Sequence, residues 1–451
     1  MSSDRSKASF LLIKSALTGA LGGLLFGFDT VVISGAVEPL AAQYHLSAAG
    51  KGFAVAIALL GTIAGALGGG PLGQKLGSRA ALRIMGVLYV ISALGCALAP
   101  GWDSFLVFRF LGGICIGGSS VLGPVYIAEL APAKWRGRLV GMFQINIVIG
   151  ILLAYLSNAI IAHFHFGAIE WRVDLGVAVV PAILFLLLLL SVPQSSRWLV
   201  SQNRIDEALL TLTRMGSPDS KAEVDAMVLS LQEDEGIGQS HLFSRKHALP
   251  IFLAISIGML NQLTGINAIL YYAPSIFAGA GFSAASANVQ AIGIGAANLL
   301  ATLLGISLID KLGRKTLLLI GAVGCGISMA GVGLVYRSNA HQNLLLPLLI
   351  GFIVFFAISQ GSVIWVYLSE VFPTSVRSKG QSLGSSTHWI MNAIIAEAFP
   401  VVAAYSHSTP FFFFAAMMVV QFFVVLTIYP ETKGYSLEAL QQKMHAARVG
   451  H

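Results

Sequence analysis

Apolar runs long enough to cross a lipid bilayer recur along the whole of this chain. A spanning helix needs about 20 mostly apolar residues, and such runs lie near residues 13–39, 53–73, 80–98, 105–131, 138–163, 172–192, 248–278, 287–310, 316–336, 344–370, 380–403 and 409–430. Backbone groups in lipid must be hydrogen-bonded within their own segment, and the runs lack the two-residue alternation of membrane strands. The sequence therefore predicts an all-α integral membrane protein with twelve transmembrane helices.

Basic residues are concentrated in alternate loops between these runs. If the N-terminus is cytoplasmic, only Lys51, Arg172 and Arg337 fall outside, and Arg109 lies within a span. Basic loops mark the cytoplasmic side of a membrane, so we expect both termini in the cytoplasm. The net charge of +7 then reflects topology, and we expect a lipid bilayer but no nucleic acid as partner. Short outer loops and the lack of an Asn-x-Ser/Thr sequon favour a bacterial plasma membrane.

Metal, nucleotide and catalytic signatures are missing from the sequence. Cys96, Cys115 and Cys325 all lie in predicted spans, and no Cys/His cluster has metal-ligand spacing. No Gly-x-x-x-x-Gly-Lys-Ser/Thr run is present to bind ATP. An intramembrane enzyme would need a nucleophile with a base, or a metal, which the lone His388 does not supply. We expect no cofactor and no enzymatic activity.

A long hydrophilic stretch divides the spans into six and six. It predicts an N-terminal six-helix bundle over 1–192, a cytoplasmic helical insert over 193–247, a C-terminal six-helix bundle over 248–430 and a cytoplasmic tail over 431–451. Two loop motifs occur once in each half: the segment from Tyr126 recurs from Tyr367, and the segment from Lys75 recurs from Lys311. Duplicated six-helix halves are typical of secondary transporters, which hold their substrate at mid-membrane between the halves.

The repeated loop motifs carry charges of the same type at the same spacing. The candidate gating residues are Glu129, Arg136, Glu370, Arg377, Asp310 and Arg314. Glutamate and arginine at the cytoplasmic helix ends can pair while an inner gate is shut and separate when it opens. Alternatively, they are ordinary interfacial charges, and their repetition records gene duplication alone.

Two charges are predicted deep in the membrane, where charge is costly and usually functional. Asp29 lies beyond the middle of the first span, and Arg109 lies in the outer part of the fourth. Their predicted depths are close enough for an ion pair, and protonation of the aspartate would release the arginine. The alternative is a static pair that locks two helices together. Glu397 is a weaker candidate proton site, and Glu38 is expected near the outer surface.

Uncharged polar side chains gather near the predicted mid-membrane level of several spans. They are Gln144, Asn261, Gln262, Asn267, Asn298, His388 and Asn392. Amides both donate and accept hydrogen bonds, which suits a neutral polyhydroxyl solute. Trp365 and Trp389 offer flat apolar faces on which a sugar ring could stack. The alternatives are hydrogen bonds that hold helices together for the amides and an interfacial belt for the tryptophans.

The seventh span contains two positions at which a helix can break. Gly265 and Pro274 favour unwinding or bending, as in the discontinuous helices that flank transporter substrates. Tyr271 lies one turn beyond Asn267 on the same helix face. We expect its hydroxyl to close over a bound sugar from the outer side.

Over essentially its whole length the chain resembles the sugar porter family of the major facilitator superfamily. The matching strings are Gly27 to Gly35, Tyr126 to Pro132 with Arg136 to Arg138, Asn261 to Asn267, Asp310 to Lys315, Trp365 with Tyr367 to Pro373, and Pro430 to Gly434. The resemblance implies two six-helix halves with alternating access and a cytoplasmic helical insert. It is closest in pattern to bacterial proton-coupled monosaccharide symporters, and we expect the protein to act as a monomer.

The resemblance also implies roles for individual residues. The family positions that face the sugar match Gln144, Asn261, Gln262, Asn267, Asn298, His388 and Trp389, while Trp365 lies beneath the sugar and Tyr271 shields it. The position of Asp29 is aspartate in the proton symporters, with Arg109 as its partner, and is replaced in facilitative animal glucose carriers. The chain is thus expected to take up a hexose or pentose with a proton. A facilitative uniporter and, more remotely, a sugar sensor are the alternatives.

Several positions depart from the family pattern. Asn261 stands where glutamine is usual, and His388 stands where glutamine or asparagine is usual. In the cytoplasmic loops of the N-terminal half, Gln74 replaces an aspartate, Ser78 replaces a basic residue, and the stretch around Gln194 lacks the usual glutamate. The first pair of changes leaves the identity of the sugar open. The second set predicts a weaker inner gate in the N-terminal half.

Overall fold

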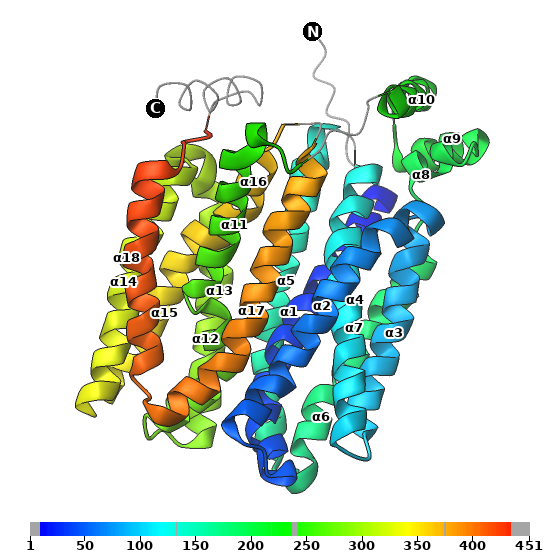
Figure 1. Ribbon diagram of the computed structural model, residues 1–451. Helices are drawn as coiled ribbons and strands as arrows, with labels where there is room; N and C mark the ends of the chain where they lie inside the picture. The colour runs from blue at the N-terminus through cyan, green and yellow to red at the C-terminus, as the bar shows by residue number, and fades with distance from the viewer. Residues whose placement is uncertain (1–9, 132, 218, 237–241, 374–375, 434–451) are drawn as a thin grey trace. The chain divides into compact units, whose positions relative to one another are not determined.

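The computed structural model describes residues 10–131, 133–217, 219–236, 242–373 and 376–433 (Figure 1). Within these ranges, 12 helical segments are long and apolar enough to cross a membrane. The uninterrupted spans are α1 (Phe10–Tyr44), α2 (Ala48–Leu76), α3 (Ser78–Leu98), α4 (Trp102–Leu130), α5 (Ala133–Phe164), α13 (Ala284–Leu312), α14 (Arg314–Ser338), α17 (Arg377–Tyr405) and α18 (Thr409–Ile428). The predicted all-α membrane fold is confirmed.

The remaining three spans are interrupted helices. The sixth consists of α6 (Glu170–Gly176) and α7 (Val179–Leu190), and the seventh consists of α11 (Ala248–Leu263) and α12 (Ile266–Gly279). The tenth joins α15 (Leu345–Phe356), a π-helical turn (Ala357–Gly361) and α16 (Ser362–Glu370). Gly265 separates α11 from α12 with a φ of 88°, a left-handed conformation that glycine adopts without steric cost. The predicted break at this glycine is present.

The hydrophilic insert is helical, as its sequence pattern indicates. It consists of α8 (Ser196–Ser201), α9 (Ile205–Met215) and α10 (Ser220–Gly236). Leu199, Leu212 and Val224, one from each of these helices, are buried in a common small apolar core. This packing explains why short amphipathic helices persist outside the spanning segments.

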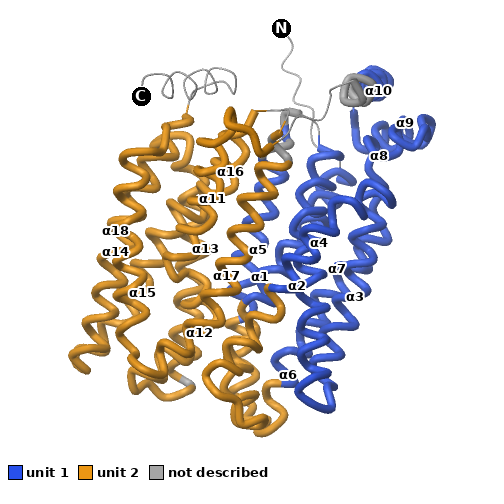
Figure 2. The backbone as a smooth tube through the Cα atoms, viewed as in Figure 1, with its two compact units in different colours: residues 1–30, 60–154, 172–238 blue, residues 31–59, 155–171, 239–451 orange. Residues whose placement is uncertain are grey.

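The chain forms two compact units (Figure 2). Unit 1 comprises residues 1–30, 60–154 and 172–238, and unit 2 comprises residues 31–59, 155–171 and 239–451. The boundaries cut through α1, α2, α5 and α6, so one end of each of these helices is grouped with the C-terminal spans inside unit 2. The predicted division of the sequence into two six-helix bundles, an insert and a tail, with boundaries at residues 192, 247 and 430, follows the internal repeat and stays a prediction.

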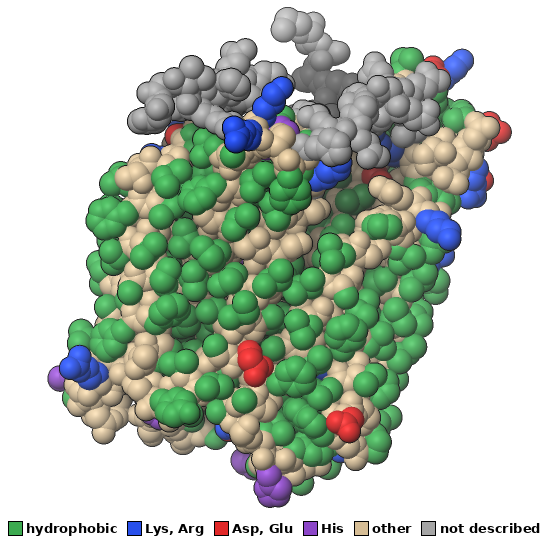
Figure 3. Space-filling view, viewed as in Figure 1, with side chains coloured by type: hydrophobic (Ala, Val, Ile, Leu, Met, Phe, Trp, Pro, Cys, Tyr) green, Lys and Arg blue, Asp and Glu red, His purple; other side chains and the backbone are tan. Residues whose placement is uncertain are grey.

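Apolar side chains cover most of the visible face of the spanning helices (Figure 3). On α7, for example, Leu184, Leu187 and Leu190 are at least half exposed. A surface of this kind is stable in lipid but not in water. We call the helix ends that carry the repeated loop motifs, such as those at Gly77 and Gly313, the basic ends, and the others the opposite ends.

Candidate functional site

A buried ion pair lies within unit 1 between α1 and α4. Arg109 Nη1 lies 3.0 Å from Asp29 Oδ1 and 3.2 Å from Asp29 Oδ2. The two residues are only 3% and 7% exposed. Close approach of the neighbouring helices depends on glycine, because a Cβ atom at Gly27 would collide with the carbonyl group of Ile147 on α5. The structure thus brings together the two charges that the sequence places at similar depth.

The pair leaves much of the guanidinium unused. One nitrogen contacts both carboxylate oxygens, and Arg109 Nε has no hydrogen-bonding partner among the described residues. A guanidinium carries five N–H donors and forms its strongest carboxylate pairs through two nitrogens. Neutralising Asp29 would leave a buried, uncompensated cation, which is strongly unfavourable. The geometry therefore ties the position of Arg109 to the charge of Asp29.

Three polar side chains of the broken seventh span are hydrogen-bonded to one another within unit 2, and one of them, Gln262, contacts the eleventh span. Gln262 Nε2 donates to Asn261 Oδ1 at 3.1 Å, and Asn267 Nδ2 donates to Gln262 Oε1 at 2.9 Å. Gln262 Nε2 also lies 3.1 Å from Nε2 and 3.2 Å from Nδ1 of His388 on α17. Asn261, Gln262, Asn267 and His388 are called the amide cluster below.

A second link between the seventh and eleventh spans involves Tyr271 and Asn392. Asn392 Nδ2 lies 3.0 Å from the Tyr271 hydroxyl, which lies 3.2 Å from Asn392 Oδ1. Both residues are buried, with exposures of 2% and 0%. The next residue, Tyr272, departs from helical geometry with φ −118° and ψ 15°. The segment that carries Tyr271 is therefore a short helix with a bend of its own.

Aromatic rings flank the amide cluster. The centroids of Trp365 and Trp389 lie 5.2 Å and 5.1 Å from that of His388. Trp365 is 38% exposed and Trp389 only 5% exposed. A half-exposed ring beside buried amides is a suitable platform for the apolar face of a sugar, and aromatic rings with convergent polar groups are typical of small-molecule sites.

The sequence analysis missed one residue that contacts this cluster. The backbone carbonyl of Gln360 accepts a hydrogen bond of 3.5 Å from Asn261 Nδ2, and the Gln360 side chain is 2% exposed. Gln360 belongs to the π-helical turn of the tenth span, a feature that occurs often at functional sites. A glutamine inside an otherwise apolar span was the available signal.

Two predicted site residues do not join the amide cluster in the described structure. Asn298 on α13 is buried, but its side chain forms no hydrogen bond with the cluster residues in the described part of the chain. Gln144 on α5 is half-buried in unit 1, whereas the cluster lies in unit 2. The roles of both residues stay predictions.

At the basic end of unit 2, Arg314 is held by two acidic side chains. Its Nη2 and Nε contact the two carboxylate oxygens of Glu370 at 2.8 and 3.2 Å, and its Nη1 contacts Asp310 at 3.0 Å. The backbone amides of Arg314 and Lys315, which begin α14, each donate to Glu431 at 3.0 Å. Three of the predicted gating residues of this half, Asp310, Arg314 and Glu370, therefore form a charged corner around the start of α14.

In the corresponding corner of unit 1, a neutral serine and a neutral glutamine stand where unit 2 has Arg314 and Glu431. Ser78 Oγ donates to Glu129 Oε2 at 2.9 Å. The backbone amide of Arg79, at the start of α3, donates to Gln194 Oε1 at 3.2 Å. The side chains of Arg136 and Arg377, the expected partners of Glu129 and Glu370, lie outside the described part of the structure.

Comparisons with known proteins agree with this architecture. The family model "Sugar (and other) transporter" matches residues 15–444. The chain is 36% identical to the D-xylose-proton symporter of Escherichia coli, with 96% of each chain covered. It is also 34% identical to the glucose facilitated diffusion protein of Zymomonas mobilis, with 98% of this chain and 99% of the relative covered.

A solved structure extends the similarity to three dimensions. The inward open conformation of the xylose transporter XylE from E. coli matches with a TM-score of 0.85 at 34% identity, covering 96% of this chain and 99% of that chain. The resemblance stated from the sequence is confirmed. The chain belongs to the sugar transporter family and is a multi-pass membrane transporter, not an enzyme.

Proposed function

We propose that this protein carries a monosaccharide, a hexose or a pentose, across the membrane together with a proton, by alternating access. Proton coupling is inferred from the Asp29–Arg109 ion pair, whose two residues are 7% and 3% exposed. A buried aspartate and arginine are costly to desolvate, so a structural role alone could be filled by apolar residues. Because the relatives named above include a proton symporter, coupling is the function that best accounts for the pair.

The amide cluster supports the sugar as cargo. Its donors and acceptors now satisfy one another at 2.9 to 3.2 Å, and a sugar hydroxyl could replace each of these contacts. Exchange of one hydrogen bond for another costs little, whereas an apolar ligand would leave buried amides unpaired. Trp365 and Trp389 would stack on the ring, and Tyr271 would close the site through Asn392. Gln144 and Asn298 complete the proposed sugar-binding set.

The proposed coupling step follows from the charge balance. When Asp29 takes a proton, the ion pair is lost and Arg109 must find another partner or move. That movement favours the conformation in which the uncompensated cation is better solvated. A coupled conformational change of this kind needs a differential interaction with the two states, which the proton supplies. The residues proposed to gate the inner side are Glu129 with Arg136 and Glu370 with Arg377, Arg314 and Asp310.

Topology and assembly belong to the same proposal. The basic ends and both termini face the cytoplasm, and the membrane is the plasma membrane of a bacterium. The transporter acts as a monomer, because each chain carries both halves of the repeat. The opposite ends are then the outer ends.

Facilitated diffusion is the second candidate function. It is favoured by the similarity to the glucose facilitated diffusion protein of Z. mobilis, which is as extensive as that to the symporter. The two candidates differ in whether sugar accumulates above its equilibrium concentration.

Uptake by purified protein in liposomes distinguishes these candidates. Radiolabelled pentoses and hexoses are supplied outside, with and without an inward proton gradient. We expect the gradient to drive accumulation of at least one monosaccharide, and an uncoupler to abolish it. Gln262→Ala is expected to lose uptake of that sugar. Equal levels with and without the gradient would favour the facilitator, and no monosaccharide uptake by a folded protein would refute both.

A further inference from the structure

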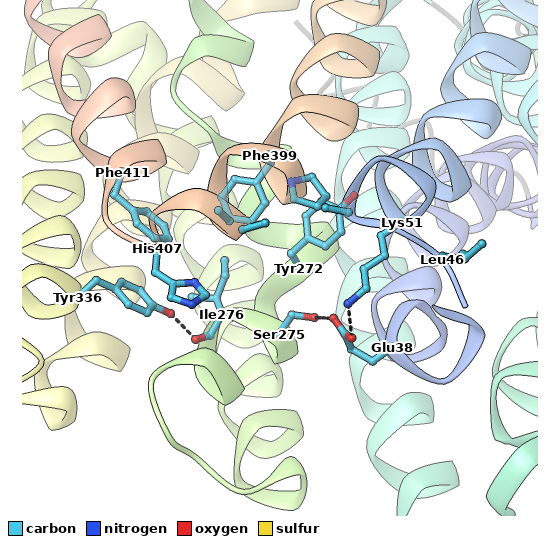
Figure 4. A pocket seen from close by; sticks show the side chains of 14 residues that line it. Glu38, Leu46, Lys51, Tyr272, Ser275, Ile276, Tyr336, Phe399, His407 and Phe411 are labelled. Atoms are coloured by element: carbon cyan, nitrogen blue, oxygen red, sulfur yellow. Dashed lines mark hydrogen bonds and ion pairs between the residues drawn. The ribbon is translucent and has the colours of Figure 1, made fainter. Parts of the chain in front are cut away.

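A cavity of about 360 Å³ opens at the outer end of unit 2, apart from the amide cluster (Figure 4). Its walls come from the end of α1, the start of α2, the outer parts of α12, α14 and α17, and the start of α18. None of the amide-cluster residues lines it, and its volume lies in the ordinary range for small-ligand pockets. The sequence analysis assigns no role to this region.

A polar network forms one wall of the cavity. Lys51 Nζ contacts Glu38 Oε2 at 2.6 Å, and Ser275 Oγ donates to Glu38 Oε1 at 3.2 Å. The ammonium has three N–H donors and each carboxylate oxygen has two lone pairs, so both groups can bind further partners. Because the ion pair is formally neutral, this wall offers donors and acceptors without a net charge.

Aromatic rings form the facing wall and are held in fixed orientations. Tyr272 stacks on Phe399 with centroids 5.3 Å apart, and Tyr336 stacks on Phe411 at the same separation. The Tyr272 hydroxyl donates to Ala396 O at 2.9 Å, and the Tyr336 hydroxyl donates to Ile276 O. The exposed His407 ring stacks on Tyr336 and adds a nitrogen at the rim.

We propose that this cavity is a second monosaccharide site, which binds sugar from the outer solution. Aromatic and aliphatic walls with a few polar groups suit a ring that has an apolar face and hydroxyls at its edge. A neutral ion pair disfavours an ionic ligand, whose charge would remain uncompensated. The assignment rests on the proposed function, in which a monosaccharide reaches this face of the protein from the outer solution.

Occupancy of the outer site would inhibit transport. Glu38 and Lys51 belong to the N-terminal spans, whereas Ser275 and His407 belong to the C-terminal half. Alternating access requires these two sets to separate when the outer side opens. A sugar that contacts both sets binds only the closed arrangement and therefore raises its population. Uptake is thus expected to fall at high external sugar.

The first test is the dependence of initial uptake rate on external sugar. The wild type is expected to pass through a maximum and then decline. Ala404→Trp, which fills the cavity, and His407→Ala should remove the decline and retain the half-saturation at low sugar. His163→Ala, an exposed histidine at the outer end of α5, is the matched control and should behave as wild type. A wild-type plateau, or a decline that persists in both cavity variants, would overturn the proposal.

A binding measurement separates this site from the proposed transport site. Equilibrium dialysis with a radiolabelled monosaccharide is carried out on Gln262→Ala protein, in which the amide cluster is disabled. Residual binding that disappears on adding Ala404→Trp supports the outer site even if transport fails. The proposal is wrong if Gln262→Ala binds no sugar, or if phospholipid occupies the cavity and added sugar does not displace it.

Discussion

At the basic ends, the two halves of the chain build the same corner from different side chains. Gly77 and Gly313 both have positive φ, 82° and 89°, and both lie against the side chain that caps the next helix. Tyr126 and Tyr367 both donate to the carbonyl of a proline, at 2.8 and 3.3 Å. The backbone frame of the repeat is therefore retained in both units.

The side chains within this frame differ in charge. Ser78 occupies the place of Arg314, and Gln194 occupies the place of Glu431. Bidentate pairs of arginine with a carboxylate are among the strongest hydrogen-bonded contacts in proteins: Arg314 makes two bonds to Glu370, both between ionised groups, whereas Ser78 makes one bond to Glu129 from a neutral hydroxyl. We therefore expect the corner of unit 1 to be held less strongly than that of unit 2, and an unequal contribution of the two halves to the proposed inner gate is a prediction of this comparison.

The largest expected effect follows from removing Glu370. Glu370→Ala leaves Arg314, 9% exposed, with Asp310 as its remaining described acidic contact, and the Asp310 side chain is 82% exposed. Loss of one partner of a largely buried pair costs about 3 kcal/mol. Thermal unfolding in detergent should show a clear fall in Tm. The control is Glu207→Ala, which breaks an exposed pair with Arg204 and should change Tm little.

The equivalent change in unit 1 should be smaller. Ser78→Ala removes one hydrogen bond to the Glu129 carboxylate and is expected to cost about 1.5 kcal/mol. The same unfolding measurement applies, and the ratio of the two losses measures the asymmetry directly. Equal losses for Ser78→Ala and Glu370→Ala would remove the basis of the comparison.

The smallest effect is expected from exchanging the helix caps. Gln194→Glu places a negative charge at the start of α3, as Glu431 does at the start of α14. An anion at a helix N-terminus stabilises by about 0.5 kcal/mol. A small rise in Tm is expected, with the reverse for Glu431→Gln. A fall in Tm for Gln194→Glu, or a rise for Glu431→Gln, would show that the two caps are not equivalent in energy.

Local features of the fold were predictable from the sequence. Hydropathy identified the spans and the hydrophilic insert between them, and glycine chemistry identified the break at Gly265. Each depends on residues near one another in the chain, so one segment carries the whole signal. The proximity of Asp29 to Arg109 followed from their depths, because membrane spans restrict each residue to one level.

Features that depend on packing between distant segments were not predictable. The π-helical turn that places Gln360 against Asn261 depends on the register of the tenth span, which its composition does not specify. The outer cavity arises near the ends of six helices, and its residues, such as Glu38 and His407, are far apart in sequence. Ser78 and Gln194 were recognised as departures, but only the structure shows that these two uncharged side chains still form hydrogen bonds that hold the corner together.

The most direct test of proton coupling is to separate accumulation from exchange in Asp29→Asn. Asparagine keeps the size of the side chain but has no charge to lose. Asp103→Asn, at an exposed aspartate of α4, is the matched control. Under an inward proton gradient, wild type and control should accumulate sugar. Asp29→Asn should only exchange labelled for unlabelled sugar across the membrane. Accumulation by Asp29→Asn at the wild-type level would contradict the proposal and leave Asp29–Arg109 as a structural pair.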